Sequence, residues 1–259
     1  MACIPADATG QANLFVKEDG IIAGMSLAEY IFTSVDPRFK FEAFVIDGDE
    51  VSKGKVAFTL SGNIRNILML ERLTLNCMQR MSGIATQTHK LVKQLEGTKT
   101  KLIDTRKTTP GIRLLEKWAV RIGGGHNHRF GLYDMVMLKD NHVDGAGGIE
   151  KAISATRDYL KKNNLGLKIE IETRNLEEVR QVISFGGADR IMLDNFSPEL
   201  LWEAVKLIGG KYETEASGGI TEANIREYAL TGVDFISSSQ MTHSVKSLDL
   251  SLKLVKSAF

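Results

Sequence analysis

Short hydrophobic segments alternate with polar turns over the first 62 residues of the chain. The segments LFV, GIIAG, FEAFVI and KVAFTL lie between Asn13 and Gly62, and turns such as Asp47-Gly48-Asp49 and Lys53-Gly54 separate them. Short hydrophobic runs bounded by glycine and aspartate are typical of β-strands. The pattern predicts a small unit rich in strands.

Between residues 64 and 95 the hydrophobic residues instead recur every three or four positions. These residues are Ile67, Leu70, Leu73, Cys77, Met81 and Ile84. Such spacing places them on one face of an α-helix, and Asn63 stands where a helix cap is expected. The pattern predicts one long helix, or two helices broken near Gly83.

After residue 100 the pattern alternates between short hydrophobic strands and amphipathic helices. The predicted strands are KLID, MVMLK, KIEIE, RIMLD, YETEA and VDFIS, and the predicted helices begin near Ile112, residue 149, residue 175, Ser197-Pro198 and Thr221. Six closely spaced repeats favour a closed or nearly closed α/β barrel over a doubly wound open sheet. Polar or small residues follow every strand, as at the mouth of a barrel. No GxGxxG turn follows the first strand, which disfavours an NAD-binding doubly wound sheet.

Composition narrows the class of protein. The chain has 259 residues, 43% of them hydrophobic, which is enough for one large domain or two unequal domains. A formal net charge of +1 argues against general binding to nucleic acids or membranes. Cys3 and Cys77 are the two cysteines, too few for a disulfide framework. The first residues lack the basic start and apolar run of a signal peptide, so we expect a cytoplasmic protein.

Positive charge is concentrated between Lys99 and Lys139, a segment that contains nine lysines and arginines but three acidic residues. Part of this excess has an ordinary explanation, because Arg113, Lys117 and Arg121 have the spacing of a solvated helix face. The other cations stand at strand ends or in a glycine-rich loop, where an anionic ligand is the better explanation; they are Arg106, Lys107, Arg129 and Lys139.

The loop Gly123–Arg129 contains two histidines, His126 and His128. A metal site is disfavoured, since no third histidine or cysteine follows at ligand spacing and Arg129 would repel a cation. An arginine beside a histidine instead suits a carboxylate, which a guanidinium can bind through two parallel hydrogen bonds.

Carboxylates and glycines mark the later strands. Glu170 and Glu172 point to the same face of one strand and Asp194 ends the next, so Glu172 and Asp194 could share a magnesium ion. Neutralisation of these carboxylates by nearby lysines is an equal alternative. Ser217-Gly218-Gly219 precedes a predicted helix, an arrangement that binds phosphate but also fits a simple helix cap.

Several literal strings in the chain carry a family resemblance. ERLTLN (71–76), MSGIAT (81–86), DTRKTTPGIRLLEKWAV (104–120) and GGGHNHRFGLYDMVMLKDNH (123–142) resemble quinolinate phosphoribosyltransferases. The later blocks IEIET, IMLDNF, EASGGIT, GVDFIS and THSVKSLDLSL keep the family's order and spacing, so the resemblance runs from about residue 14 almost to the end.

The resemblance implies a fold and a domain division. An N-terminal α/β sandwich domain would cover residues 1–82, and an incomplete, seven-stranded type of α/β barrel would cover 83–246 as the catalytic domain. Residues 247–259 would pack back on the first domain. Family members usually begin with a further helix, so part of the first domain would lie outside this chain.

The resemblance also implies an activity and its residues. Quinolinate would react with phosphoribosyl pyrophosphate to give nicotinate mononucleotide, pyrophosphate and CO2, a step of NAD biosynthesis that uses Mg2+ and no organic cofactor. The dicarboxylate pocket would contain Arg106, His128, Arg129 and Lys139, with Arg72 donated across a homodimer interface. Lys107 and Lys139 would face pyrophosphate, and Glu172 and Asp194 the magnesium-bound ribose. The phosphate would be bound by Ser217, Gly218, Gly219, Ser238, Ser239, Gln240 and His243.

Two positions depart from the family pattern, and two rival functions stay open. Ser239 stands where a glycine is common, so a side chain could crowd the phosphate or add a donor, and His126 is assigned no role. The first rival is a phosphoribosyltransferase for another acid, such as nicotinate or the substrate of a molybdenum-associated homologue. The second is a catalytically silent phosphate-binding barrel, which the intact Lys107, Lys139, Glu172 and Asp194 disfavour.

Overall fold

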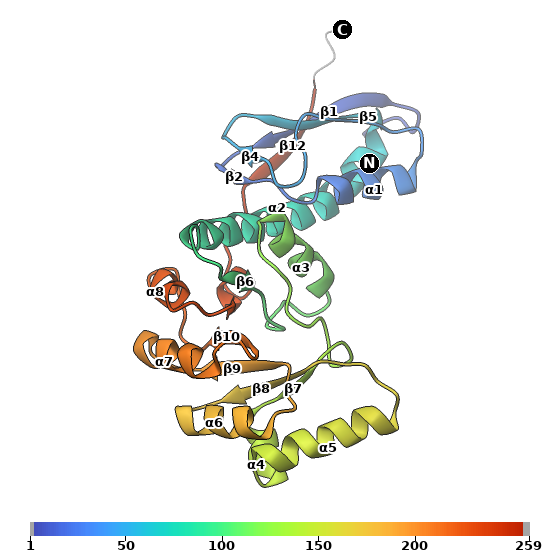
Figure 1. Cartoon of the computed structure of the whole chain (residues 1–259). Coiled ribbons are helices and arrows are strands. Elements are labelled where there is room, and N and C mark those ends of the chain that lie inside the picture. The colour runs from blue at the N-terminus through green and yellow to red at the C-terminus, as the bar shows by residue number, and fades with distance from the viewer. Residues whose placement is uncertain (1–2, 256–259) are drawn as a thin grey trace. The chain divides into compact units, whose positions relative to one another are not determined.

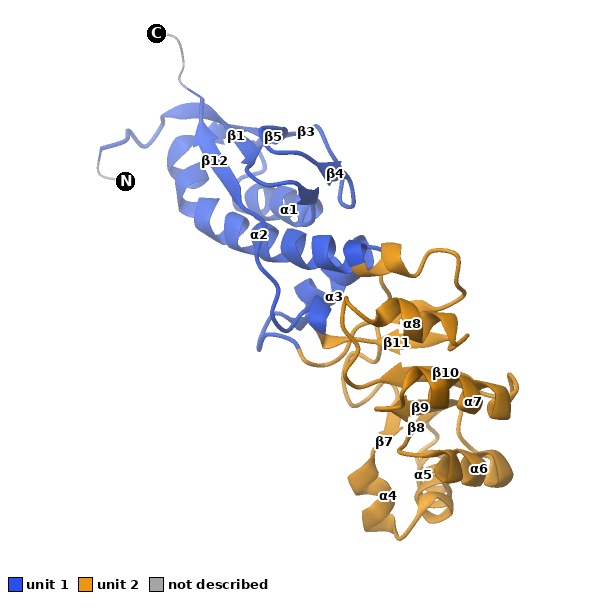
Figure 2. Cartoon of the chain, turned by 90° about the vertical axis from the view of Figure 1, so that its left-hand side faces the viewer, with its two compact units in different colours: residues 1–90, 108–124, 240–259 blue, residues 91–107, 125–239 orange. Residues whose placement is uncertain are grey.

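The computed structural model describes residues 3–255 of the chain, which forms two compact units (Figure 2). Unit 1 contains residues 1–90, 108–124 and 240–259, and unit 2 contains residues 91–107 and 125–239. These units are defined by contacts, and the domain division expected at residues 82 and 83 stays a prediction. Within the described range, no helix is long and apolar enough to cross a membrane.

Unit 1 is built on an antiparallel sheet (Figure 1). Its strands are ordered β12 (Leu250–Leu254), β1 (Thr9–Val16), β5 (Val56–Asn63) and β3 (Lys40–Ala43), and β2 (Gly20–Ile21) pairs with β4 (Glu50–Val51). The last strand therefore returns to pair with the first. Alternate residues of β1, among them Ala12, Leu14 and Val16, are fully buried, which is the period of two that a half-buried strand requires.

Helix α1 (Met25–Val35) was not among the predicted elements, since the sequence around it was interpreted as strands and turns. Its buried residues Ala28 and Phe32 have helical spacing, but the helix carries no local capping signal. The cap comes instead from Asp47, whose carboxylate accepts hydrogen bonds from the N–H groups of Met25 (2.8 Å) and Ser26 (3.3 Å). A cap supplied from 22 residues away cannot be predicted from a local pattern.

The long helix α2 (Ile64–Gln94) confirms the helical period and is continuous through Gly83. The Asn63 side chain accepts a hydrogen bond from the N–H of Asn66 at 3.2 Å, as expected for a cap. A Cβ atom at Gly83 would lie only 2.3 Å from the Lys246 carbonyl oxygen. This glycine therefore allows close approach of the chain segment before β12, and it does not break the helix.

Helix α3 (Arg113–Ile122) belongs to unit 1 and is joined to α2 by a buried ion pair. Both Nε and Nη2 of Arg80 donate to one oxygen of Glu116, at 2.9 and 2.8 Å, and the other oxygen accepts from the N–H of Thr109. The expectation that Lys117 belongs to a solvated face was wrong, because this residue is 1% exposed. Arg121 is exposed as expected, but Leu114 is also exposed, at 66%, so hydrophobic spacing alone did not place every residue of this helix on the right face.

Unit 2 contains a parallel sheet of six strands. Their order is β6 (Lys101–Ile103), β11 (Phe235–Ser237), β10 (Glu213–Ser217), β9 (Arg190–Asp194), β8 (Ile169–Thr173) and β7 (Val136–Leu138), and a parallel bridge from Ile103 to His126 adds a seventh segment beside β6. From β7 to β11 the strands follow the chain, and the last one pairs with the first strand, β6. This order is that of an incomplete α/β barrel and excludes the doubly wound sheet, in which the order reverses at a switch point.

The helices of unit 2 follow the strands and stack as a row, α5 (Ile149–Lys162), α6 (Leu176–Phe185), α7 (Pro198–Ile208) and α8 (Ile225–Leu230), with α6 to α8 along one side of the sheet in Figure 1. Ser197 caps α7 as expected. Two predictions need correction. The short helix α4 (Asp140–Ala146) was missed, and α8 begins at Ile225 because residues near Thr221 form a turn held by the Asn224 side chain.

Candidate active site

Charged side chains occupy alternate positions of three adjacent strands. Strand β8 carries Glu170 and Glu172, β9 carries Arg190 and Asp194, and β10 carries Glu215. Side chains two residues apart on a strand share a face. Arg190 pairs with Glu215, and His128 contacts both Glu170 and Glu215, so this face is common to all three strands, and it carries two groups at different depths.

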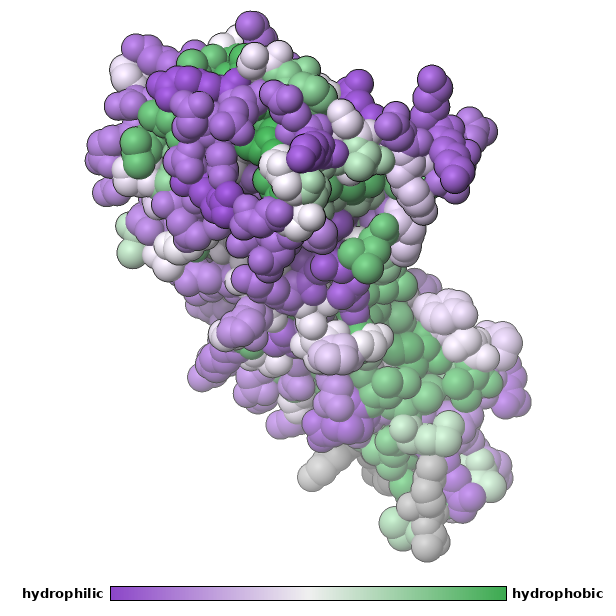
Figure 3. All heavy atoms as spheres, turned by 90° about the horizontal axis from the view of Figure 1, so that it is seen from below, coloured by the Kyte–Doolittle hydropathy of each residue, from purple (hydrophilic) through white to green (hydrophobic). Residues whose placement is uncertain are grey.

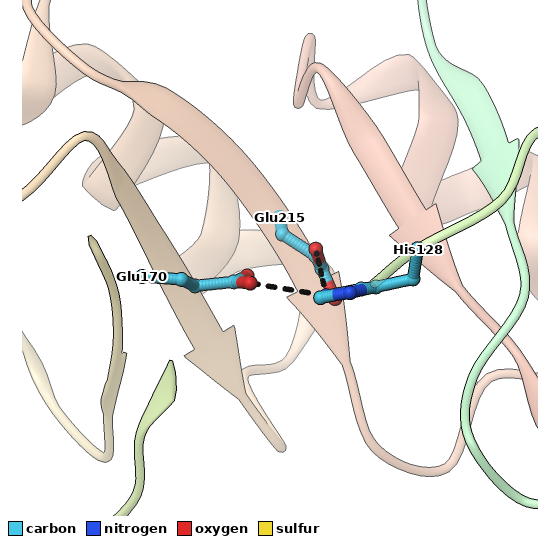
Figure 4. Close-up of side chains that lie close together, drawn as sticks. All are labelled: His128, Glu170 and Glu215. Carbon is cyan, nitrogen blue, oxygen red and sulfur yellow. Dashed lines mark ion pairs between the residues drawn. The ribbon is translucent and has the colours of Figure 1, made fainter. Parts of the chain in front are cut away.

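The deeper group, the buried cluster, consists of His128, Glu170, Arg190 and Glu215. Nε2 of His128 lies 3.0 Å from Glu170 Oε2 and 3.3 Å from Glu215 Oε2, and the three side chains converge from a loop and two strands (Figure 4). Arg190 Nη1 lies 3.1 Å from Glu215. Glu170 and Glu215 are 0% exposed, so their charges depend on these partners rather than on water.

These contacts shift the proton affinities of the buried cluster. Burial alone would lower the pKa of His128, but the contacts with Glu170 and Glu215 outweigh it and raise the pKa to about 9. Burial and the charge of Glu215 raise the pKa of Glu170 to about 7. Burial opposes ionisation of Glu215 too, but His128 holds its pKa below the ordinary value. The cluster therefore retains a proton that free side chains would release at neutral pH.

Arg129 stands next to this cluster and near a second guanidinium. Burial and then the charge of Arg106 lower the pKa of Arg129, while Glu170 opposes the shift. The Arg129 guanidinium donates to the carbonyl oxygen of Met135 at 3.2 Å. Two arginines whose charges repel each other form a site that an anion would stabilise. The structure thus brings together Arg106 and Arg129, which the sequence placed near one anion.

The second group, the mouth cluster, consists of Lys139, Glu172 and Asp194 at the carboxyl ends of β7, β8 and β9. Lys139 Nζ lies 2.9 Å from Glu172 Oε2, and the Lys139 side chain is 47% exposed. Burial and then the charge of Glu172 raise the pKa of Asp194. Asp194 also accepts a hydrogen bond from Asn195 Nδ2 at 2.6 Å. The ion pair fits the alternative of lysine-neutralised carboxylates, whereas the repulsion at Asp194 fits a site for a cation.

The glycine loop after β10 has a conformation that requires glycine. Gly218 and Gly219 have φ angles of +90° and +65°, and a Cβ atom on Gly218 would lie 2.2 Å from Asn195 Oδ1. The expected start of a helix directly after this loop was wrong, since α8 begins at Ile225. Any phosphate site here would depend on the loop itself and not on a helix dipole.

The remaining predicted residues fall in both units. Lys107, exposed after β6, and Ser238, buried after β11, belong to unit 2, and Ser239 begins a short 3-10 helix there. Arg72, Gln240 and His243 are exposed in unit 1, and His243 contacts Ser244. The binding roles of all these residues stay predictions.

Arg190 and Glu215 are functional candidates that the sequence interpretation did not select. The spacing of the residues could have identified them, because Arg190 stands four residues before Asp194, and Glu215 stands two residues before Ser217. Both therefore share the face of residues that were selected. A criterion based on polar residues at strand ends excludes residues that lie deeper in the same strands.

Comparison with known proteins decides the family. The family model described as the quinolinate phosphoribosyl transferase N-terminal domain matches residues 1–82, and that of the C-terminal domain matches residues 84–253. The chain belongs to the quinolinate phosphoribosyl transferase family. The resemblance inferred from the sequence strings is thereby confirmed.

Relatives of this family are similar over nearly the whole chain. A mitochondrial quinolinate phosphoribosyltransferase [decarboxylating] 2b of Nicotiana tabacum is 49% identical over 98% of this chain and 76% of its own length. A chloroplastic nicotinate-nucleotide pyrophosphorylase [carboxylating] of Arabidopsis thaliana has the same identity and coverage. The crystal structure of NadC from Streptococcus pyogenes superimposes with a TM-score of 0.92 at 38% identity, covering 98% of this chain and 90% of that one. The fold expected of this family, with its barrel, is confirmed.

Proposed function

We propose that this member of the quinolinate phosphoribosyl transferase family transfers the phosphoribosyl group of phosphoribosyl pyrophosphate to quinolinate, and releases pyrophosphate and CO2 to give nicotinate mononucleotide for NAD biosynthesis. The observation that carries the choice of acid is the pair Arg106 and Arg129, in which the charge of Arg106 contributes to lowering the pKa of Arg129. A dicarboxylate supplies one negative charge for each guanidinium. A monocarboxylate would supply only one such charge and so form fewer charged hydrogen bonds with the pair.

The mouth cluster has the charges that phosphoribosyl transfer needs. As pyrophosphate leaves, positive charge develops on ribose C1, and the carboxylates of Glu172 and Asp194 stabilise it. Lys139 and Lys107 stabilise the departing anion. These roles require the cluster to hold both signs of charge side by side, and the 2.9 Å contact of Lys139 with Glu172 supports this.

A magnesium ion carried by phosphoribosyl pyrophosphate fits this donor set. Carboxylate oxygens are the ligands that Mg2+ prefers, and the like charges that raise the pKa of Asp194 would be relieved by a cation. Glu172 and Asp194 would hold the ion, directly or through water. When bound, it would neutralise charge on the leaving pyrophosphate.

The ring chemistry needs no nucleophilic side chain. The pyridine nitrogen of quinolinate attacks C1, and the ring becomes a cationic pyridinium. Its positive nitrogen stabilises the electron pair left on the adjacent ring carbon when that carboxylate departs as CO2, and a proton then replaces it. The protein's task is to hold the acid in position for the reaction, for which Arg106, Arg129 and Lys139 offer donors.

The phosphate of the ribose is assigned to Ser217, Gly218, Gly219, Ser238, Ser239, Gln240 and His243.

A homodimer with Arg72 donated across the interface is part of the proposal. Hydrophobic side chains next to Arg72 on α2 are exposed, namely Leu68, Met69 and Leu73, at 37%, 53% and 54%. On the face drawn in Figure 3, hydrophobic residues gather in one patch, while much of the rest of this face is hydrophilic. Exposed apolar patches of this kind mark interfaces.

The cytoplasmic location stays a prediction, and some plant relatives carry the words mitochondrial or chloroplastic in their names.

The direct test is product formation. The purified protein is incubated with phosphoribosyl pyrophosphate, Mg2+ and either quinolinate or nicotinate, and nicotinate mononucleotide is measured. Product and CO2 from quinolinate alone support the proposal, and Arg129→Ala should abolish both. Product from nicotinate alone would favour a phosphoribosyltransferase for a monocarboxylate. No product from either acid with a folded dimer would favour a silent phosphate-binding barrel.

A further inference from the structure

Both ring nitrogens of His128 contact other groups of the protein. Nε2 faces Glu170 and Glu215, as the dashed lines in Figure 4 show. Nδ1 accepts a hydrogen bond from the backbone N–H of Arg129 at 2.6 Å. The ring is only 4% exposed. It therefore links two buried carboxylates to the backbone of a residue of the proposed acid pocket.

The donor atoms of His128, Glu170 and Glu215 lie close enough together to hold a metal ion. The contact at Nδ1 argues for a proton instead. Because Nδ1 accepts an N–H, the proton of the ring stands on Nε2, the atom that a metal would need, and the further proton that the buried cluster retains is shared with the two carboxylates. Arg190 already supplies a positive charge to Glu215 at 3.1 Å. A proton-bearing network accounts for the site without a metal.

The network fixes residues 128 and 129 from several strands. The backbone N–H of His128 donates to Asp104 Oδ1 at 2.8 Å, just after β6. The ring is held from β8 by Glu170 and from β10 by Glu215. The Arg129 guanidinium then reaches the carbonyl of Met135. A small rotation of the His128 ring would release the Arg129 backbone and change where its guanidinium points.

We propose that Glu215 and Arg190 are positioning residues for the acid pocket, which act through the ring of His128 on Arg129. This inference rests on the proposed function, in which Arg129 binds a carboxylate of quinolinate. The proposal predicts that the two substrates are affected differently. Loss of the network should weaken the binding of the acid and leave the binding of phosphoribosyl pyrophosphate unchanged, because the mouth cluster has separate partners.

The strand β10 offers a matched control. Glu213 and Glu215 stand two residues apart and both contact Arg190 at 3.1 Å, but Glu213 is 39% exposed and Glu215 is 0% exposed. Within the part of the chain that the structure describes, Glu215 pairs with His128 and Glu213 does not. Glu215→Gln and Glu213→Gln therefore remove equivalent charges from Arg190, and only the first disturbs the His128 ring.

The test measures quinolinate affinity by calorimetry, together with kcat and both KM values, for the wild type and the two variants. Glu215→Gln should raise the Kd and KM for quinolinate about tenfold, as expected for loss of one charged contact, with the KM for phosphoribosyl pyrophosphate within about twofold. Glu213→Gln should match the wild type. A wild type that binds no quinolinate would refute the proposed function. A wild type that binds it, with Glu215→Gln unchanged or weakened equally for both substrates, would refute the positioning role alone.

A spectroscopic measurement decides the matter even if Glu215→Gln does not fold. In wild-type protein with 15N-labelled histidine, the five histidines are few enough for His128 to be assigned by comparison with His128→Gln. The proposal expects Nε2 of His128 to be protonated at pH 7 and to remain so after chelation of metals. A metal bound at Nε2, or a ring that titrates like a free histidine, would overturn it.

Discussion

The two carboxylates of strand β8 stand two residues apart and face the same way, yet their surroundings differ. Both are buried, Glu170 at 0% and Glu172 at 8% exposed, but Glu170 contacts the buried His128, whereas Glu172 pairs with Lys139, whose side chain is 47% exposed. The position along one strand thus determines the surroundings of each glutamate. Glu170 contacts only buried protein groups in its ion pair, whereas the partner of Glu172 can also reach water. The same residue type, on the same face, is thus enclosed by buried partners at one level and paired with an accessible lysine at the next.

The largest expected effect distinguishes these two glutamates by stability. Glu170→Ala should lower the free energy of unfolding by about 3–5 kcal/mol, because it leaves buried positive charge and a cavity. Glu172 is itself only 8% exposed, but its partner Lys139 can reach water, so Glu172→Ala should cost less, about 1–2 kcal/mol. Urea unfolding monitored by circular dichroism gives both values. Equal losses would show that the two levels do not differ as described.

The lysine of the mouth cluster should matter for activity and not for stability. Lys139→Ala should reduce kcat about 100-fold, since it removes a cation that stabilises the leaving anion, while the unfolding midpoint stays unchanged. Lys168→Ala is the control, because Lys168 also pairs with a glutamate, Glu213, at 3.5 Å and is 62% exposed. Its kcat should equal that of the wild type. An unaffected Lys139→Ala enzyme would remove Lys139 from the chemistry.

The third prediction concerns the pH dependence of stability. The pKa of His128 is raised to about 9 from 6.5, so the folded state retains a proton that the unfolded state releases. A raised pKa contributes stability that is fully present below pH 6.5 and is lost as the pH rises through 9. The raised pKa of Glu170, about 7, acts in the same direction. Unfolding free energy should fall by about 2 kcal/mol between pH 7 and pH 9.

His128→Gln is the control for this titration, because it removes the ring that holds the proton. Its unfolding free energy should change much less over the same interval. A wild-type profile that is flat, or that rises from pH 7 to pH 9, would contradict the proton retention inferred for the buried cluster.

The sequence predicted those parts of the fold that local patterns determine. The alternating strands of unit 2 and the long helix α2 follow from periodicity, and the strings around Arg129 identified the family. Helix α1 was missed because Asp47 caps it from a distance, and Lys117 was assigned to the wrong face because its burial depends on tertiary packing. Glu215 was missed for a different reason. Strand alternation gives the face of a residue, but depth along that face depends on the partners that the fold brings to it.

The smallest expected effect tests the mouth cluster without touching its charges. Gly218 and Gly219 both have positive φ angles, so an alanine at either position costs about 1–2 kcal/mol of backbone strain. At Gly218 the added Cβ would also displace Asn195, whose side chain donates to Asp194 at 2.6 Å. A Cβ atom added at Gly219 would have no other atom within 4 Å, apart from those of the neighbouring residues in the chain.

Gly218→Ala should therefore be the less stable of the two variants and lower kcat several-fold more than Gly219→Ala, since only the first loosens Asp194 while the buried cluster is left intact. Thermal melting and kcat at saturating substrates, measured side by side, separate strain from displacement. If Gly219→Ala raised the KM for phosphoribosyl pyrophosphate more than Gly218→Ala did, the open loop at Gly219 would be the surface that binds the substrate. The loop would then act on the substrate phosphate directly, and the orientation of Asp194 by Asn195 would be of little consequence.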